Sequence, residues 1–335
     1  MAYKENRIDV VEFTKLRYPG LPLAIDDMSL AFHLGIHNST LWWLVHKADG
    51  MYRVFKIPKA SGGHRVIQNP GDKLKHVQRM ILVHLLHKFP FGEHVGAYVP
   101  ERSIMHTAQQ HVGRAVVISL DLKDFFPSVT RAMVRRFMNY AGYPHRVSSI
   151  IAQLVTYQGC LPQGAPTSGA MANLVADLNF DRHVIAALRA MDPRWVYTRY
   201  SDDMDISHPE KQPADVVAHV IHLVQQHARA AGFRLNASKT SVDTQAQQQS
   251  VLGVVVNVEP HIARFKYRRL RAIIHNCATY GFDAQAARNK MTGAEFYAHL
   301  VGKISYIRQI SPETAERLAD QLEAARQGRK EVFGG

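Results

Sequence analysis

The pattern of hydrophobic and polar positions becomes regular after residue 51. Two runs of β-favouring residues, 52–58 and 64–67, are joined by a turn that contains Gly62 and Gly63, which predicts a β-hairpin. Over residues 72–88 the spacing changes, because apolar side chains recur every three or four positions and the basic side chains fall between them. This spacing predicts an amphipathic helix with a basic outer face.

A second series of elements starts at residue 115. Residues 115–120 are apolar and rich in β-branched side chains, which predicts a buried strand that ends at Asp121. A turn at residues 161–168 then leads into a long helix, with Pro166 in its first turn. Residues 251–256 return to a strand pattern.

A second hairpin is predicted by the runs at residues 195–200 and 204–207. Asp202 and Asp203 stand at its turn, where two neighbouring like charges repel each other. A bound cation would remove the repulsion, and the usual cation for an oxygen-only acidic site is Mg²⁺. A solvated acidic turn is the alternative, because aspartate is common in turns for its own reasons.

The strand pattern stops at about residue 258, and the remainder predicts helices only. Apolar positions at helical spacing precede a start signal at Ser311 and Pro312 for a last helix. The pattern therefore predicts an α+β chain in three parts: a helical leader at residues 1–50, a mixed core at 51–257 and a helical region at 258–335.

The net charge of the chain indicates the kind of partner that it binds. The 335 residues contain 41 lysines and arginines against 28 acids, a formal net charge of +13. This surplus indicates a polyanionic partner, with nucleic acid ahead of a membrane surface because no apolar run approaches about 18 residues. The charged N-terminus is unlike a signal peptide, and two cysteines exclude a disulfide framework, so we expect a cytoplasmic protein.

The predicted placement of three acids is compatible with nucleotidyl transfer. Asp121 leaves a strand, and Asp202 and Asp203 stand at a hairpin turn. In-line nucleotidyl transfer uses two divalent ions, about 4 Å apart, and needs few protein carboxylates because substrate phosphates complete the shell. We expect two Mg²⁺ ions, with Mn²⁺ as an alternative, on an antiparallel sheet backed by helices.

Several motifs between residues 52 and 310 resemble, in their order, those of a reverse transcriptase. They are Asp121 with Phe125-Phe126, Leu161-Pro162-Gln163-Gly164, Tyr200-Ser201-Asp202-Asp203, Leu235-Asn236 with Lys239-Thr240, and Val251-Leu252-Gly253. The chain most resembles the bacterial retron enzymes. Thr107-Ala108-Gln109-Gln110-His111 is similar to their Asn-Ala-x-x-His signature, and residues 251–253 are similar to their Val-Thr-Gly, with departures at Thr107 and Leu252.

This resemblance implies a right-hand polymerase with fingers and palm at residues 51–257 and a helical thumb at 258–335. It also implies roles for single residues. Asp121, Asp202 and Asp203 would bind metal, and Lys239 would neutralise or protonate the departing pyrophosphate. The implied nucleotide-binding residues are Lys59 and Arg65 at the triphosphate, Phe126 as the side chain that excludes a 2′-hydroxyl, and Gln163, Gly164 and Tyr200.

The resemblance implies nucleic-acid contacts as well. Gly253 would lie near the primer end, where a missing side chain lets the backbone come close. The thumb would bind phosphates through a dense basic run, namely Arg264, Lys266, Arg268, Arg269 and Arg271.

Each role has a structural alternative. The phenylalanines could belong to the core, an alternative favoured for Phe125 over Phe126, and the basic side chains could be ordinary surface residues. Asp205, close to the acids, is expected in a hairpin salt bridge or on the surface. His111 is expected to be structural or to contact RNA.

For a retron enzyme, the resemblance implies RNA-templated DNA synthesis from deoxynucleoside triphosphates. Its partner would be its own structured noncoding RNA, with priming from a guanosine 2′-hydroxyl, a branched RNA–DNA product and a role in anti-phage defence with a separate effector protein. A group II intron-like enzyme is the nearest alternative, and a catalytically silent RNA-binding scaffold is an alternative of another class. The bulky Phe126 disfavours an RNA-synthesising polymerase.

Overall fold

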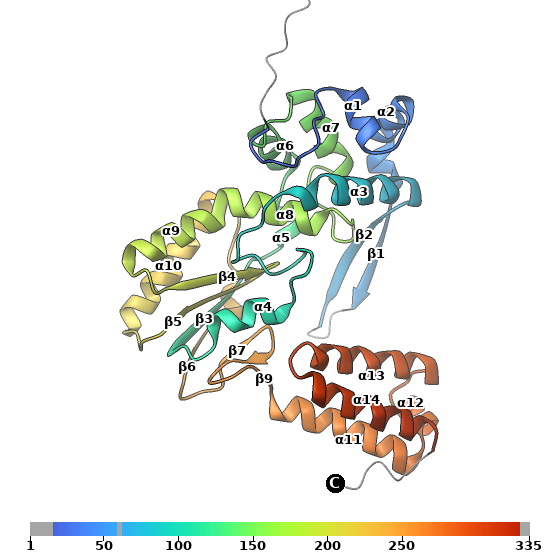
Figure 1. Ribbon diagram of the computed structural model, residues 1–335, viewed down its shortest axis with the longest axis vertical. Coiled ribbons are helices and arrows are strands. Elements are labelled where there is room, and N and C mark those ends of the chain that lie inside the picture. Colours follow the sequence, from blue (N-terminus) through green and yellow to red (C-terminus); the bar gives the residue numbers. More distant parts are fainter. Residues whose placement is uncertain (1–15, 59–61, 329–335) are drawn as a thin grey trace, which may run out of the picture. The chain divides into compact units, whose positions relative to one another are not determined.

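The computed structural model, drawn in Figure 1, describes residues 16–58 and 62–328. The chain splits into two compact units. The first unit takes in Met1–Gly92, Asp124–Arg182 and Ala228–Phe233, and the second takes in Glu93–Lys123, His183–His227 and Arg234–Gly335. Both units are therefore assembled from segments that are distant in the sequence.

The first unit joins a β-hairpin to a group of helices. Its strands are β1 (Tyr52–Pro58) and β2 (His64–Pro70), and its helices are α1 (Asp27–His33), α2 (Asn38–Lys47), α3 (Asp72–His84), α5 (Phe125–Ser128), α6 (Arg131–Tyr140), α7 (His145–Val155) and α8 (Ser168–Ala176). Helix α7 contacts α1, α2, α3 and α6, and most of its residues are buried. The antiparallel hairpin β1–β2 and the amphipathic helix α3 confirm the sequence pattern.

The second unit is built around a four-stranded antiparallel sheet in the order β4–β5–β3–β6. Its strands are β3 (Val116–Asp121), β4 (Val196–Tyr200), β5 (Asp203–His208) and β6 (Ser241–Thr244). Its helices are α4 (Ile104–Ala108), α9 (Arg182–Met191) and α10 (Ala214–Ala230), although Arg182 of α9 and residues 228–230 of α10 count with the first unit. Strand β3 lies inside the sheet and is almost wholly buried, which explains its continuous apolar run.

A smaller sheet and a helical bundle complete the second unit. The sheet has strands β7 (Ser250–Val251), β8 (Val254–Val255) and β9 (His261–Ile262), and the bundle has helices α11 (Arg264–Tyr280), α12 (Phe282–Arg288), α13 (Gly293–Arg308) and α14 (Pro312–Arg326). The bundle has its own core, which includes Leu270, Phe296 and Leu318. The sequence missed β9 because two residues are too short to show an alternating pattern.

Short helical turns modify two of the predicted helices. They are η1 (Ala48–Met51), η2 (Leu86–Lys88), η3 (Gln109–His111), the π-helical η4 (Asp177–Asp181) and η5 (Ala237–Lys239). The α-helix predicted over residues 72–88 ends at His84 and continues as η2. The long helix after residue 168 is interrupted by η4 before α9.

Among the described helices, none is both long and apolar enough to cross a bilayer.

His111 links η3 to the sheet. Its Nδ1 lies 2.7 Å from the Ser207 hydroxyl, and its Nε2 lies 2.7 Å from the Thr198 hydroxyl. The ring is completely buried, and burial, followed by the charge of Arg114, lowers the pKa of His111 to about 3. The structural role expected for His111 is therefore confirmed.

This low pKa predicts a pH-dependent contribution to stability. Between about pH 6.5 and pH 3 an unfolded chain protonates His111 and the folded chain does not, so the free energy of unfolding falls as the pH falls. Relative to a His111→Gln variant, the parent should lose about 1.4 kcal/mol between about pH 7.5 and pH 5.5. Urea unfolding at both pH values measures this difference, and a difference that stays constant with pH would contradict the assignment.

Candidate active site

Three aspartates meet at one end of the four-stranded sheet. Asp121 at the end of β3 pairs in register with Asp203 at the start of β5. Asp202 lies in the two-residue turn between β4 and β5, and its carbonyl accepts a hydrogen bond of 2.8 Å from the Leu122 amide. The sequence predicted this hairpin and the acids at its turn, and the strand register now brings the third acid next to them.

The turn that carries Asp202 depends on groups that the sequence did not single out. Ser201 has a left-handed backbone, with φ of 63°, as a two-residue hairpin turn requires. The guanidinium of Arg199, fully buried beneath the turn, donates a hydrogen bond to the Ser201 carbonyl. An arginine within the otherwise uncharged strand Val196–Tyr200 was the available signal, since a buried charge needs a specific partner.

Lys239 supplies a cation to this cluster. Its Nζ forms an ion pair with Asp121 Oδ2, while more than half of its side chain stays exposed. The segment before it is fixed beside β3, because the Asn236 amide donates to the Asp121 carbonyl at 2.8 Å. Lys239, a predicted catalytic residue, therefore lies next to a predicted metal ligand.

The three carboxylates carry more negative charge than the Lys239 ammonium can neutralise. Burial, together with the negative charges of Asp202 and Asp121, raises the pKa of Asp203 to about 6. The hydrogen bond to Asp121 raises the pKa of the Lys239 ammonium in turn. Three carboxylates around one ammonium offer an oxygen-only donor set with excess negative charge, and this set fits Mg²⁺ or Mn²⁺.

A hollow of about 330 Å³ opens beside the acids and is lined by Asp121, Asp203 and Lys239. It extends along the sheet to Asp205 and to Leu252 in the β7–β8 turn. The smaller sheet therefore forms part of the wall of this hollow, through Ser250 and Leu252.

Asp205 corrects one expectation. The Asp205 carboxyl is buried and not on the surface, and it accepts a hydrogen bond of 2.6 Å from the Ser119 hydroxyl. Among the described residues no cation forms a salt bridge with it. Burial raises the pKa of Asp205 to about 7. The signal was available, because Asp205 lies two residues after Asp203 and alternate residues of a strand share one face. Asp205 thus extends the acidic face of β5.

Tyr200 lies beside a glycine of a neighbouring segment. The Gly96 amide donates to the Arg199 carbonyl at 2.9 Å, and a Cβ on Gly96 would come within 3.0 Å of the Tyr200 ring and 2.1 Å of the Thr107 hydroxyl. Gly96 is thus required for this close approach. No pattern in the sequence points to this role of Gly96.

The other predicted nucleotide-binding residues belong to the first unit. Arg65 is exposed on β2, and Lys59 lies outside the described residues. The Gln163 carbonyl accepts a hydrogen bond of 2.9 Å from the Gln68 amide. A Cβ on Gly164 would lie 2.8 Å from the Gln68 carbonyl, so this turn packs closely on β2.

The two phenylalanines after β3 differ in burial, as predicted. Phe125 is buried, with its ring centroid 5.7 Å from that of Phe233, whereas Phe126 is only partly buried. Asp124 before them has a left-handed backbone, with φ of 51°. Phe125 is therefore a core residue, and Phe126 keeps part of its ring accessible.

Gly253 lies in the β7–β8 turn with φ of 81°. A Cβ there would stand 2.7 Å from the Tyr306 hydroxyl and 2.8 Å from Lys266 Nζ. Tyr306 also donates a hydrogen bond of 3.1 Å to the Leu252 carbonyl. The absent side chain therefore lets the turn contact the helical bundle.

The predicted basic run forms the first two turns of α11. All five members are exposed: Arg264, Lys266, Arg268, Arg269 and Arg271. They are available to a ligand in solution.

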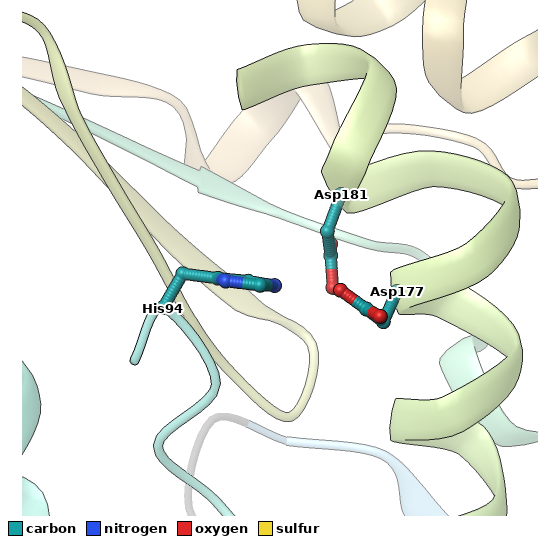
Figure 2. A group of neighbouring side chains, drawn as sticks. All are labelled: His94, Asp177 and Asp181. Atoms are coloured by element: carbon teal, nitrogen blue, oxygen red, sulfur yellow. The ribbon is translucent and has the colours of Figure 1, made fainter. Parts of the chain in front are cut away.

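A separate pair of acids lies in the first unit, on the π-helical turn η4. Figure 2 shows the Asp177 and Asp181 side chains adjacent on the same helical ribbon. Each offers a carboxylate oxygen within 4.8 Å of the other's. Asp177 is already paired with Arg182, at 2.7 Å. This pair shares no residue with the three predicted metal ligands.

Comparisons with known proteins agree with this geometry. A family model described as reverse transcriptase (RNA-dependent DNA polymerase) matches residues 57–256. The retron Mx65 reverse transcriptase of Myxococcus xanthus is 35% identical over 322 residues, covering 90% of this chain and 72% of that protein. The retron Ec86 reverse transcriptase of Escherichia coli is 31% identical over 310 residues, covering 91% of this chain and 90% of that protein. The chain therefore belongs to the reverse transcriptase family, among the retron enzymes.

Proposed function

We propose that Asp121, Asp202 and Asp203 form the catalytic metal site of an RNA-directed DNA polymerase. The observation that carries this proposal is the strand register, which pairs Asp121 with Asp203 and fixes Asp202 through the Leu122 amide. When bound, two Mg²⁺ ions would activate the attacking hydroxyl and stabilise charge on the leaving pyrophosphate.

The protein groups have distinct tasks in this proposal. The three carboxylates would bind the two metal ions at the end of the sheet. Lys239, which pairs with Asp121 and remains largely exposed, supplies an ammonium to the pyrophosphate as it departs. The hydrogen bond between Ser119 and Asp205 keeps β3 and β5 in register beneath the acids.

The nucleotide-binding roles extend the proposal into the first unit. Phe126 excludes a ribose 2′-hydroxyl, and its partly exposed ring supports this role. Arg65, with Lys59, holds the triphosphate, and Gln163, Gly164 and Tyr200 contact the nucleotide or the template. The proposed division is fingers and palm at residues 51–257 and a thumb at 258–335.

We propose that the nucleic acid is held by the exposed basic residues of α11, with Gly253 near the primer end. Replacing Arg268, Arg269 and Arg271 together with glutamine should weaken RNA binding and reduce its dependence on salt. Loss of two or three phosphate contacts lowers the slope of log K against log salt by roughly 2, at about 0.7–0.9 per contact. Titration of labelled RNA at several salt concentrations measures this slope.

A control removes the same charge elsewhere. Arg135, Arg136 and Arg229 are exposed and lie outside the proposed sites. Their replacement with glutamine should leave the slope within experimental error of the parent's. Equal slopes for the parent and the α11 variant would assign the basic run to plain surface.

The retron relatives support a more specific proposal. The enzyme uses its own structured noncoding RNA as template, starts from the 2′-hydroxyl of a guanosine in it, and makes single-stranded DNA that stays joined to the RNA through a branch. This product serves anti-phage defence together with a separate effector protein.

The product can be tested directly. Cells that express the protein with its RNA should contain DNA that a nuclease specific for DNA removes and whose mobility increases after RNase treatment, because the attached RNA is lost. Cleavage by a 2′–5′ debranching enzyme should release the two strands. DNA that carries no RNA at its 5′ end would contradict the branched product and leave plain reverse transcription.

A further inference from the structure

A hollow of about 660 Å³ lies between α11 and α13 of the helical bundle. Its floor is apolar and includes Ile262, Leu270 and Ile307, and its size is within the roughly 300–1,000 Å³ typical of ligand pockets. The Tyr306 ring forms part of the wall, next to the β7–β8 turn that its hydroxyl holds. The hollow lies apart from the three carboxylates.

The rim of this hollow is positively charged. Lys266 and Arg269 from α11 and Lys303 from α13 line it, and none of its lining residues is acidic. The whole of α11 contains no acid, and α13 contains one, Glu295 at its N-terminal end. An apolar floor below three cations suits a ligand that has both a flat apolar part and a phosphate.

Phe265 stands at the edge of the same hollow. Its side chain is 63% exposed, and it does not belong to the core of the bundle. It also borders a second hollow, of about 770 Å³, which is lined by Arg264, Arg268 and Gln248. An exposed aromatic ring between two basic hollows provides a surface on which a base can stack.

Gly302, an exposed residue, also lines the first hollow. It lies inside α13, where glycine costs roughly 0.5–1 kcal/mol relative to alanine. A Cβ at this position would have no atom within 4 Å. Packing of the described residues therefore gives no reason for the glycine, whereas a larger side chain here would enter the hollow.

From these observations we infer that the α11–α13 hollow binds an unpaired nucleotide of a single-stranded nucleic acid. The base lies against Phe265 and the apolar floor, and its phosphate contacts Lys266, Arg269 and Lys303. A double helix keeps its bases stacked inside and would leave both the ring and the floor unused. The inference rests on the proposed binding of nucleic acid by α11 and adds that the bound segment there is unpaired.

Single-residue variants of the full chain test this inference. Fluorescence anisotropy measures the affinity for a labelled oligouridine and for a labelled RNA–DNA duplex. Phe265→Ala should weaken oligouridine binding about tenfold, the order expected for one stacked base, and duplex binding less than about twofold. Tyr280→Ala is the matched control, because Tyr280 is on the same helix, is 66% exposed and lies outside both hollows, and it should bind like the parent.

A second pair of variants fills the hollow without removing a contact. Gly302→Leu should reproduce the tenfold loss for oligouridine, whereas Ser305→Leu, on an exposed position of α13 outside the hollow, should bind like the parent. Irradiated 4-thiouridine RNA should form adducts on the parent peptide that contains Phe265, and these should disappear in Gly302→Leu.

Two outcomes would overturn the inference. Unchanged oligouridine binding in both Phe265→Ala and Gly302→Leu would leave the hollow to another partner, such as a protein. Equal losses for oligouridine and duplex would assign the hollow to paired nucleic acid. Primer extension by the parent protein is scored separately, so that failure of this inference is distinguishable from failure of the proposed polymerase site.

Discussion

An Asp202→Asn, Asp203→Asn double variant should lose DNA synthesis by at least about a thousandfold, since it removes two of the three carboxylates that would hold the catalytic ions. The variant should remain folded. Asparagine has the shape of aspartate. Burial, followed by the negative charges of Asp202 and Asp121, raises the pKa of Asp203 to about 6, so the ionised Asp203 carboxylate is unfavourable in the absence of a metal ion. In metal-free buffer its free energy of unfolding should therefore equal or exceed that of the parent.

DNA synthesis should fall while the free energy of unfolding does not, and this combination makes the test specific. Primer extension measures the activity, and urea unfolding in a chelator measures the stability. Asp215→Asn is a suitable control, because Asp215 is exposed on α10 and lies outside the site, and it should synthesise DNA like the parent. A double variant that keeps its synthesis within about tenfold of the parent would remove these acids from the metal site.

Phe126→Ala should reduce the discrimination against ribonucleotides by roughly 10- to 100-fold, because the side chain that excludes the 2′-hydroxyl is lost. The quantity to measure is the ratio of kcat/KM for a deoxynucleotide to kcat/KM for the matching ribonucleotide. The fall in this ratio should come from a higher kcat/KM for the ribonucleotide and not from a general change in rate.

Phe125→Ala is the matched control for the neighbouring ring. Phe125 is buried against Phe233, so its loss should cost about 3–5 kcal/mol of stability and leave the sugar ratio close to the parent's. A ratio that is the same in Phe126→Ala and the parent would remove Phe126 from its proposed role.

Much of the fold could be predicted because its signals are local. The hairpins at residues 52–67 and 195–207 and the amphipathic helix α3 follow from the spacing of apolar residues. The order of the motifs adds the right-hand polymerase fold and the retron family, both of which the comparisons confirm. The boundaries of fingers, palm and thumb stay a prediction.

The rest of the site depends on strand pairing, which a single sequence does not encode locally. Ser119 and Asp205 are 86 residues apart and meet only because β3 pairs with β5 in one register. Gly96 is needed because its segment lies against β4, and the buried Arg199 guanidinium finds the Ser201 carbonyl through the turn that follows the strand. The expectation of Asp205 in a salt bridge or on the surface was wrong. The alternation of β5 could have placed Asp205 on the face of Asp203, but its hydrogen bond to Ser119 requires this strand register.

The remaining alternatives differ in what they predict for the acids. A catalytically silent scaffold would not need them, whereas Asp121, Asp202 and Asp203 are brought together with Lys239 in one cluster. The retron assignment has more direct support than the group II intron-like alternative, because two retron reverse transcriptases match about nine tenths of this chain.

Extension of a DNA primer on a defined RNA template by the purified protein tests the central claim most directly. With deoxynucleoside triphosphates and Mg²⁺, the parent should produce DNA complementary to the RNA, and a chelator should stop the synthesis. Failure of the folded parent to extend the primer with either Mg²⁺ or Mn²⁺, or an equal rate in the chelator, would contradict the claim.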